Sequence, residues 1–308
     1  MKHSQCNLQP VPLCGILHLF YYSNHFIAII GEVKVKTKGT AWIIGASSGL
    51  GLATAQAFAK DGWLVVAGAR SFTMPEDRQV GEAYYHLPLD VTDEGSCNAF
   101  VREALTLSNR VDVLCYSAGL LSLGSCEETG TDLYERVMST NFLGMTRMIT
   151  KVLPVMREQG SGKLFLFSSL NGILGIPFQS AYTASKHAIE GYAQCLAMEV
   201  RPFGISVCVV EPGDHQKGSQ AYRLKLGNLL QTYAKEYAST CMTIQRDEMG
   251  GLHPETLGLK VLRQANRRKP RYRLRIARLD QRTACWLHGL LPPGLFFAGI
   301  RAYYVKKG

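Results

Sequence analysis

The chain has 308 residues, of which 46% are hydrophobic and 19% charged, so it can form a packed core and intrinsic disorder is excluded as its main state. Its net charge of +10 is local: residues 260–308 carry 13 Lys and Arg against one Asp, whereas residues 1–259 carry 21 against 23 acidic residues. The nine cysteines are scattered and form no Cys-x-x-Cys pair. This pattern excludes a disulfide-stabilised secreted domain and indicates reduced thiols in a cytoplasmic protein.

The N-terminal residues 1–38 differ from the rest of the chain. An apolar stretch over residues 13–30 is interrupted by His18 and Asn24, and lysines follow it rather than precede it. A membrane-spanning helix needs about 20 apolar residues, and a signal peptide carries its positive charge ahead of the apolar run. We therefore predict an irregular extension over residues 1–38, with a membrane-spanning or signal segment as the alternative.

From Thr40 onward, apolar runs of strand length alternate with helix-length segments. The runs span residues 41–44, 64–67, 111–116, 163–167 and 206–210. Their hydrophobicity is continuous rather than alternating, which is typical of parallel strands that helices bury on both faces. We predict an α/β fold with a doubly wound parallel sheet, the Rossmann fold, as a single domain over residues 39–280. Residues 281–308 are predicted to form a C-terminal cap.

A glycine-rich turn joins the first apolar run to an Ala-rich helical segment. The turn contains Gly45, Gly49 and Gly51. Glycines let the backbone approach a pyrophosphate, and the N-terminus of the following helix offers unpaired N–H groups and a positive dipole end. The position between a buried strand and a helix favours a dinucleotide site. A glycine turn with no cofactor role is the alternative.

The second apolar run leads into Ala69 and Arg70. A site for NAD would place Asp or Glu here, about 20 residues past the glycines, to bind the ribose 2′-hydroxyl. No acidic residue stands at this point, and a guanidinium pairs well with a phosphate. We therefore predict NADP(H) rather than NAD(H), with a surface arginine of no cofactor role as the alternative.

Tyr182 and Lys186 are separated by one helical turn, which places both on one face of a helix. A free phenol has a pKa near 10, and a nearby cation stabilises the phenolate and lowers that pKa, as acid–base chemistry on a carbonyl requires. The Tyr-x-x-x-Lys pattern alone is common. It gains weight from Ser169, which lies 13 residues before Tyr182 at the end of a buried run.

Together with Asn141, these features resemble the short-chain dehydrogenase/reductase family. The resemblance covers about residues 38–280. Within the family, residues 111–119 and 172–182 look most like the 17β-hydroxysteroid and retinol dehydrogenase branch. The resemblance implies an oxidoreductase that moves a hydride between a nicotinamide and a carbonyl or alcohol carbon. It also implies a homodimer or homotetramer.

The resemblance assigns roles to four catalytic residues. Tyr182 transfers the proton, and Lys186 lowers the pKa of Tyr182 and holds the nicotinamide ribose. Ser169 forms a hydrogen bond with the substrate oxygen, and Asn141 positions a water in a proton relay to Lys186. All four positions carry the residue that the family pattern requires.

The resemblance also extends to the cofactor. Asp90 and Val91 would contact the adenine, and Pro212 and Gly213 would pass beneath the nicotinamide. The complete set of expected cofactor-binding residues is Gly45, Ser47, Ser48, Gly49, Leu50, Gly51, Arg70, Asp90, Val91, Ser117, Ala118, Gly119, Tyr182, Lys186, Pro212 and Gly213. Three positions depart from the family pattern, namely Ile44, Tyr116 and Lys217, and they affect details of cofactor affinity rather than the chemistry.

Residues 214–250 are predicted to form a substrate lid. Its apolar and aromatic residues are Tyr222, Leu224, Leu226, Leu229, Leu230, Tyr233 and Tyr237. They favour a hydrophobic substrate, although core-facing helix positions would explain many of them equally well. Asp214 and His215 are predicted to be solvated loop residues. The eight histidines show no ligand spacing, so no metal site is predicted.

The excess of basic over acidic residues is concentrated in residues 267–276, where arginines alternate with Tyr272, Leu274 and Ile276. This period of two predicts an edge strand with one packed face, because charge on an edge strand blocks unwanted pairing. Attraction to an acidic membrane or substrate is an alternative, and nucleic-acid binding is the least favoured one. The apolar residues 286–304 are predicted to cap the substrate pocket, with a membrane surface as the alternative.

The sequence therefore predicts an NADP(H)-dependent oxidoreductase for a small hydrophobic ketone, aldehyde or secondary alcohol of steroid, retinoid or lipid type. Two alternatives stay open. One is a non-catalytic NADP(H)-binding sensor, and the other is a membrane-associated scaffold with the same fold.

Overall fold

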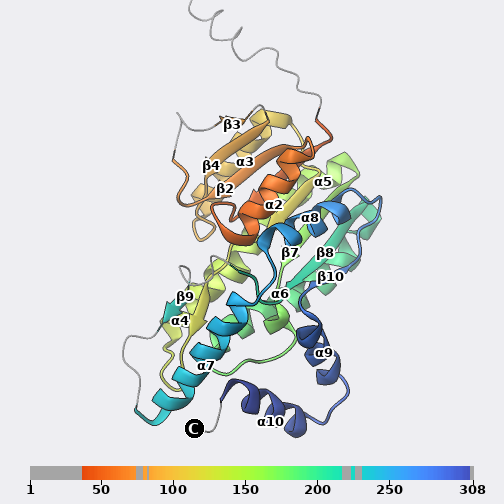
Figure 1. Ribbon diagram of the computed structural model, residues 1–308. Helices are drawn as coiled ribbons and strands as arrows, with labels where there is room; N and C mark the ends of the chain where they lie inside the picture. The colour runs from red at the N-terminus through yellow and green to blue at the C-terminus, as the bar shows by residue number, and fades with distance from the viewer. Residues whose placement is uncertain (1–36, 74–78, 82, 217–222, 226–230, 306–308) are drawn as a thin grey trace, which may run out of the picture. The chain divides into compact units, whose positions relative to one another are not determined.

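The computed structural model describes residues 37–73, 79–81, 83–216, 223–225 and 231–305 (Figure 1). Residues Thr37–Gly308 form one compact unit. Most of the predicted N-terminal extension, residues 1–36, lies outside the described residues. None of the described helices has the length and apolarity needed to cross a membrane.

An eight-stranded sheet forms the centre of this unit. Its strands in chain order are β1 (Thr40–Ile44), β2 (Leu64–Ala69), β3 (Gln79–Gly81), β4 (Tyr84–Pro88), β5 (Val113–Tyr116), β7 (Gly162–Phe167), β8 (Ile205–Pro212) and β10 (Arg273–Ile276). The spatial order is β10-β8-β7-β5-β1-β2-β4-β3, and every neighbouring pair is parallel except β3 with β4. All five predicted strands are present, which confirms the doubly wound α/β fold.

Helices cover both faces of the sheet. They are α2 (Gly49–Lys60), α3 (Glu94–Ser108), α5 (Gly144–Gln159), α6 (Ser180–Glu199) and α8 (Pro254–Ala265), while α4 (Thr131–Met138) packs beside α6. Alternate residues of β1 enter two separate cores: Trp42 packs with α3, α5 and α6, whereas Ile43 packs with α2 and α8. Both residues are fully buried. This two-sided burial is why the strands read as continuous apolar runs.

The strand order reverses at β1. The chain continues from β1 to β2 and β4 on one side, and then returns to β5 on the other side. In open α/β sheets, ligands bind beyond the carboxyl ends of the strands at such a reversal point. The topology thus locates the binding crevice at the ends of β1 and β5.

The basic segment forms an edge strand, as its period of two predicts. β10 pairs with β8 alone in the sheet order, and Ile276 is fully buried. The arginines do more than protect an edge, however. Arg275 Nε lies 2.7 Å from Glu211 Oε2, and Arg273 also pairs with Glu211, whose side chain is fully buried. These two arginines therefore neutralise a carboxylate in the sheet.

A smaller group of elements lies beyond the carboxyl ends of the sheet strands (Figure 1). It consists of the two-stranded parallel sheet β6 (Leu121–Leu123) and β9 (Arg223–Lys225), with the helices α7 (Gln231–Met249), α9 (Leu279–His288) and α10 (Pro293–Tyr304). The described residues also contain three short helical turns between the helices and strands: η1 (Ser139–Leu143), η2 (Leu170–Gly172) and η3 (Arg201–Phe203). Of these elements, β6, η2, α7, α9 and α10 contribute residues to a cavity beside the crevice.

Candidate active site

The glycine-rich turn after β1 requires glycine for steric reasons. Gly45 has a φ of +84°, and a Cβ atom there would lie 2.5 Å from the Ala118 nitrogen. A Cβ atom on Gly51 would lie 2.1 Å from the Gly45 carbonyl oxygen. Non-bonded atoms do not approach so closely, so the turn and the segment after β5 pack directly backbone to backbone. The space beside them remains open to a ligand.

The helix that follows presents a free N-terminus to this space. The Ser48 side chain makes no capping hydrogen bond at the start of α2, and the first turn carries no acidic residue. The first N–H groups and the positive end of the helix dipole are thus available to an anion. A pyrophosphate fits this arrangement.

A cavity of about 470 Å³ extends from this turn across the ends of β1, β2, β5 and β7. Every residue predicted to bind the cofactor lines it, from Gly45 through Arg70 and Asp90 to Gly213. The departure at Ile44 also lines the cavity, whereas Lys217 lies outside the described residues. The turn, the uncapped helix and the residues that line the cavity fit a nicotinamide dinucleotide.

Ser169, Tyr182 and Lys186 meet at one end of this cavity. Ser169 follows β7 and Tyr182 lies in the first turn of α6, and their hydroxyl groups share a hydrogen bond. Lys186 lies one turn further along α6, with its Nζ 5.5 Å from the centre of the Tyr182 ring. Lys186 Nζ also donates a 2.8 Å hydrogen bond to the Phe167 carbonyl. The predicted triad is thus assembled in space.

Burial determines the protonation of this group. Burial raises the pKa of Tyr182 to about 12, although the hydrogen bond with Ser169 acts in the opposite direction. Burial also lowers the pKa of Lys186 to about 8, partly offset by Glu190. Desolvation of the phenolate is the largest influence on the pKa of Tyr182, and the lowering of this pKa by Lys186 stays a prediction. At neutral pH the phenol carries its proton.

Asn141 lies in the π-helical turn η1, between α4 and α5. Its Oδ1 accepts a 2.7 Å hydrogen bond from the Leu120 nitrogen, and its Nδ2 donates to the Leu120 carbonyl at 3.0 Å and to Ser185 Oγ at 2.9 Å. Asn141 thereby fastens the segment after β5 to α6. Single π turns within helices occur frequently at functional sites, and no pattern in the sequence predicts this one.

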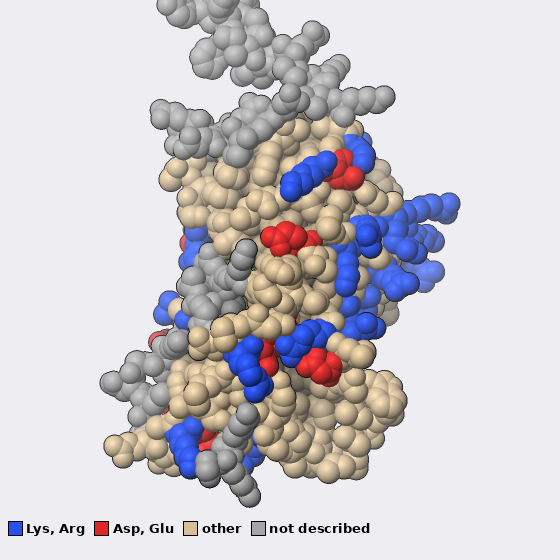
Figure 2. All heavy atoms as spheres, viewed as in Figure 1, with Lys and Arg blue, Asp and Glu red and all other residues tan. Residues whose placement is uncertain are grey.

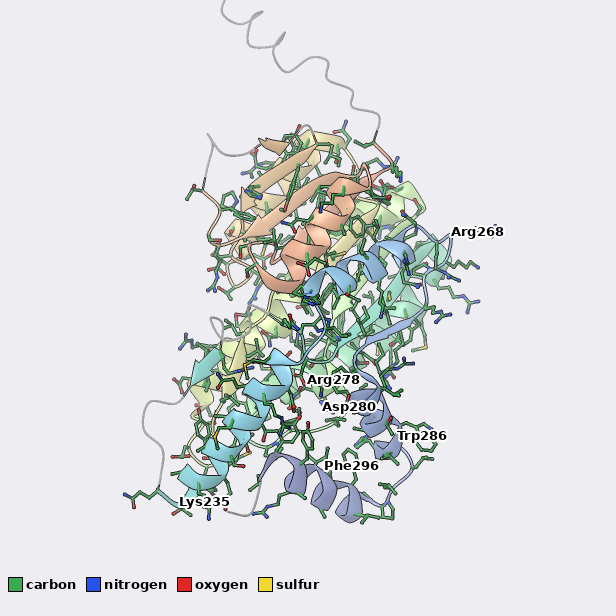
Figure 3. All side chains as sticks on the ribbon, in the orientation of Figure 1. Lys235, Arg268, Arg278, Asp280, Trp286 and Phe296 are labelled. Carbon is green, nitrogen blue, oxygen red and sulfur yellow. The ribbon has the colours of Figure 1, made fainter. Side chains whose placement is uncertain are left out.

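A second cavity, of about 430 Å³, adjoins the first. Much of its wall is apolar and comes from α9, α10 and the turn between them, including Leu287, Leu291 and Phe296. Figure 3 shows Phe296 on α10. Ser169 and Tyr182 line both cavities. The proposed proton donor thus stands where the two cavities meet.

His215 is buried and Asp214 is only partly exposed, whereas the sequence predicted that both are solvated loop residues. His215 is buried, and its Nδ1 lies 2.9 Å from the Gly213 carbonyl oxygen. Asp214 lines the second cavity and accepts a hydrogen bond from the Gln281 side-chain amide. Burial raises the pKa of Asp214 to about 6, and the carboxylate of Asp247 adds to the rise. The loop after Gly213 is folded inward against α9.

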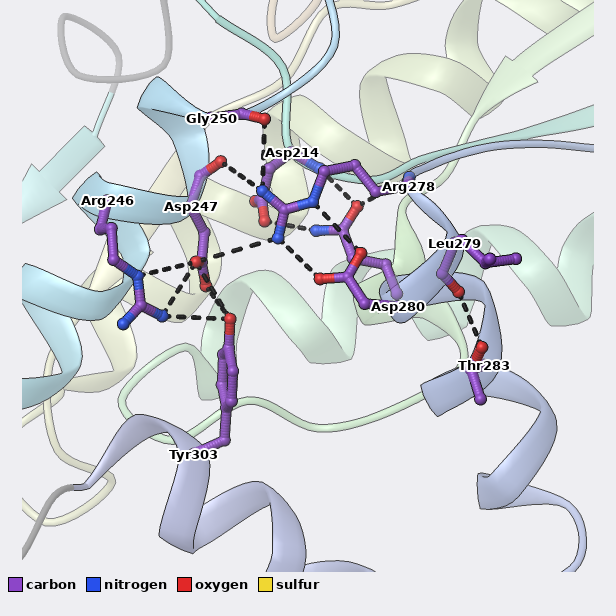
Figure 4. Close-up of polar contacts among 10 residues, drawn as sticks. Asp214, Arg246, Asp247, Gly250, Arg278, Leu279, Asp280, Thr283 and Tyr303 are labelled. Atoms are coloured by element: carbon purple, nitrogen blue, oxygen red, sulfur yellow. Dashed lines mark hydrogen bonds and ion pairs between the residues drawn. The ribbon is translucent and has the colours of Figure 1, made fainter.

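A polar network joins α7 to α9 and α10 along the second cavity (Figure 4). Tyr303 donates to both Asp247 carboxylate oxygens, at 3.0 and 2.9 Å. Arg246 lies 3.0 Å from Asp247, and Arg278 lies 4.0 Å from Asp247 and 2.8 Å from Asp280. Sequence reasoning missed these residues. Their types are common on surfaces, and their positions span 57 residues of sequence from Arg246 to Tyr303.

The predicted lid is partly described. The helix α7 forms most of it, and Tyr237 on this helix is buried in contact with Leu123. Residues 217–222 and 226–230 lie outside the described residues, including four of the apolar positions singled out in the sequence. No three His, Cys, Asp or Glu side chains of the described residues gather as a metal site would require.

Residues 39–222 match the sequence profile of the short chain dehydrogenase family. The chain belongs to this family. It is 34% identical over 267 residues to a 3-ketodihydrosphingosine reductase of Bacteroides thetaiotaomicron, which covers 86% of this chain and 97% of that protein. It is 31% identical over 276 residues to dehydrogenase/reductase SDR family member 7B of Xenopus laevis, covering 86% of this chain and 81% of that one.

A solved structure agrees with this assignment. The crystal structure of a short-chain dehydrogenase from Streptomyces avermitilis superposes with a TM-score of 0.74 and 29% identity, and covers 87% of this chain and 94% of that chain. The resemblance found in the sequence is thus confirmed. The protein is a short-chain dehydrogenase/reductase, an oxidoreductase of CH–OH groups with a nicotinamide cofactor.

Proposed function

We propose that this short-chain dehydrogenase/reductase reduces hydrophobic ketones or aldehydes with NADPH, and oxidises the corresponding alcohols in the reverse direction. The observation that carries the proposal is the position of Ser169 and Tyr182 in the wall shared by the dinucleotide cavity and the apolar cavity. A nicotinamide bound in the first cavity supplies or accepts the hydride. A carbonyl carbon placed where the two cavities adjoin would lie against that nicotinamide and beside both hydroxyl groups.

The four catalytic residues have separate roles in this reaction. Ser169 donates a hydrogen bond to the carbonyl oxygen, and Tyr182 gives that oxygen its proton as the hydride reaches the carbon. A raised pKa suits this step, because a phenol that is protonated at neutral pH is ready to act as the acid. The Lys186 ammonium stabilises the phenolate that remains. Asn141 holds the segment after β5 against α6, beside the phenolate of Tyr182 that must regain its proton.

The second cavity supports a hydrophobic substrate with a polar group. Its apolar side chains favour an alkyl or ring system, and the carboxyls of Asp214, Asp247 and Asp280 also line it. Arg246 and Arg278 balance the charge of Asp247 and Asp280. Asp214 instead bonds to a neutral amide, so it is suited to accept a hydrogen bond from a hydroxyl or amino group of the substrate. The ketone in the name of the Bacteroides relative is the first compound to test.

The end of β2 supports NADP(H) over NAD(H). Arg70 follows the last residue of β2, lines the dinucleotide cavity and is exposed to it. Ser71, next to it, lines the same cavity, and no acidic residue stands at this strand end. A guanidinium here attracts a ribose 2′-phosphate, and no carboxylate repels it.

Replacement of Arg70 by Ala tests the cofactor. We expect the KM for NADPH to rise about tenfold to hundredfold, as for a lost charged hydrogen bond, with the KM for NADH nearly unchanged. Oxidation of both cofactors is measured side by side against a steroid ketone, retinal, an aromatic ketone and 3-ketodihydrosphingosine. Arg102→Ala, an exposed arginine on α3, is the matched control. A wild-type preference for NADH would overturn the role of Arg70.

The pH dependence follows from Lys186. Since its pKa is lowered to about 8, the ammonium is largely present at neutral pH and is lost as the pH rises through that value. We expect kcat/KM for ketone reduction to be constant near neutrality and to decrease above about pH 8. Lys186→Arg keeps the charge and should move the decrease to higher pH. A profile for the wild type that stays flat well beyond pH 8 contradicts this assignment.

A further inference from the structure

The segment from α9 through α10 exposes apolar side chains that the fold does not use. No Lys, Arg, Asp or Glu occurs in residues 283–300, here called the α9–α10 elbow. The elbow contains four large apolar side chains that are each about 60% exposed, namely Trp286, Leu290, Leu295 and Phe297. Single exposed apolar residues are normal, but several in one uncharged segment mark an interaction surface.

The two sides of the elbow have different functions. On the inner side, Phe296 and Cys285 are buried, and Leu287, Leu291 and Ile300 line the substrate cavity or pack against it. These contacts explain the apolar residues that point inward. They do not explain the outer side, where Trp286 extends away from the cavity (Figure 3). The elbow therefore caps the cavity and also presents a second apolar surface.

Positive charge gathers on the same side of the molecule, at the start of β10, whereas the elbow follows the end of that strand. The turn between α8 and β10 carries Arg267, Arg268, Lys269 and Arg271, and all four are exposed. Their side chains form no ion pair with an acidic residue of the described ranges. Figure 2 shows Lys and Arg gathered on the same side of the molecule as the uncharged elbow, and Figure 3 places Arg268 on that side near the end of β10 that lies away from the elbow.

We propose that the α9–α10 elbow docks on the surface of an anionic lipid bilayer. Trp, Phe and Leu side chains enter the boundary between headgroups and acyl chains, and the basic turn lies over the anionic headgroups. α10 has 12 residues, which suits a helix that lies on a membrane rather than one that spans it. Since the inner side of the elbow lines the substrate cavity, docking places that cavity beside the lipid.

A second copy of the chain is the competing occupant of this surface. Contact between two elbows would also bury Trp286 and Phe297. It would make no use of the cations of the basic turn, because the elbow itself carries no acidic residue that could pair with them. An anionic bilayer satisfies both the apolar residues and the cations. The charge pattern therefore favours lipid over self-association.

Co-sedimentation of the full chain with lipid vesicles tests the proposal, and it needs neither cofactor nor substrate. Vesicles are made of phosphatidylcholine alone or with phosphatidylglycerol. We expect the wild type to bind the anionic vesicles, and Trp286→Ser/Phe297→Ser to lower the partition coefficient by at least about tenfold. Met198→Ser/Leu259→Ser removes two exposed apolar residues elsewhere and is the matched control, with binding expected to be unchanged.

Two further measurements make each outcome decisive. NADPH titration shows that each variant is folded, and light scattering without vesicles gives the oligomeric state. Arg267→Gln/Arg268→Gln should weaken binding to anionic vesicles and leave the neutral ones unaffected. The proposal is overturned if the wild type does not bind anionic vesicles, or if the elbow variant binds them equally well. A change of oligomeric state without vesicle binding would assign the elbow to self-association.

Discussion

Replacement of Tyr182 by Phe should lower kcat for ketone reduction by about a thousandfold or more, with the affinity for NADPH nearly unchanged. The ring keeps its packing in α6, but the proton that the phenol supplies to the substrate oxygen is gone. General acid catalysis alone contributes about 10²- to 10⁴-fold, and Ser169 also loses its hydroxyl partner. Steady-state oxidation of NADPH gives kcat, and a fluorescence titration gives the affinity.

A second tyrosine on the same helix provides the control for this variant. Tyr192 is half-buried on α6 and packs against Phe142, away from the residues that line either cavity. Tyr192→Phe should leave kcat within about twofold of the wild type, because it removes a hydroxyl that takes no part in the reaction. If Tyr182→Phe retains a rate comparable with that of Tyr192→Phe, Tyr182 is not the proton donor.

Replacement of Gly51 by Ala should weaken NADPH binding by about a hundredfold or more. The new Cβ atom would lie 2.1 Å from the Gly45 oxygen and 2.4 Å from Ser117 Oγ, so the turn must open. Overpacking of this kind costs about 1–3 kcal/mol, and an opened turn also moves the N–H groups that face the pyrophosphate. A fluorescence titration with NADPH measures the loss.

Two other glycines separate the steric effect from a general effect of alanine. Gly49, in the same turn, has a φ of +54° but open space around a Cβ atom, so Gly49→Ala should show only a modest loss from backbone strain. Gly191, within α6, also has open space, and Gly191→Ala should bind NADPH normally. Wild-type affinity in Gly51→Ala would show that this close approach is not required.

Local patterns predicted much of the site. The glycine turn follows β1 directly, and Tyr182 and Lys186 share one helical turn, so sequence spacing alone places their side chains. The five central strands were predictable for a related reason. Each is buried on both faces, and its sequence therefore reads as an unbroken apolar run.

Features that depend on tertiary packing escaped prediction. Asp214 looks like an exposed loop residue in the sequence, and in the structure it is partly buried and hydrogen-bonded to Gln281 of α9. The pKa of Tyr182 depends on how completely the phenol is desolvated, which no local spacing encodes. Arg273 and Arg275 suggested a solvated strand face, and their buried partner Glu211 lies on a different strand.

The most direct measurement is kcat/KM with NADPH for a series of straight-chain ketones that differ by one methylene group. If the carbonyl is reduced beside Tyr182 and the chain enters the apolar cavity, kcat/KM should rise about fourfold per methylene, because each buried methylene contributes about 0.8 kcal/mol. The rise should stop once the chain fills the cavity of about 430 Å³. If no ketone in the series leads to oxidation of NADPH, or if kcat/KM does not depend on chain length, the second cavity is not where the substrate binds.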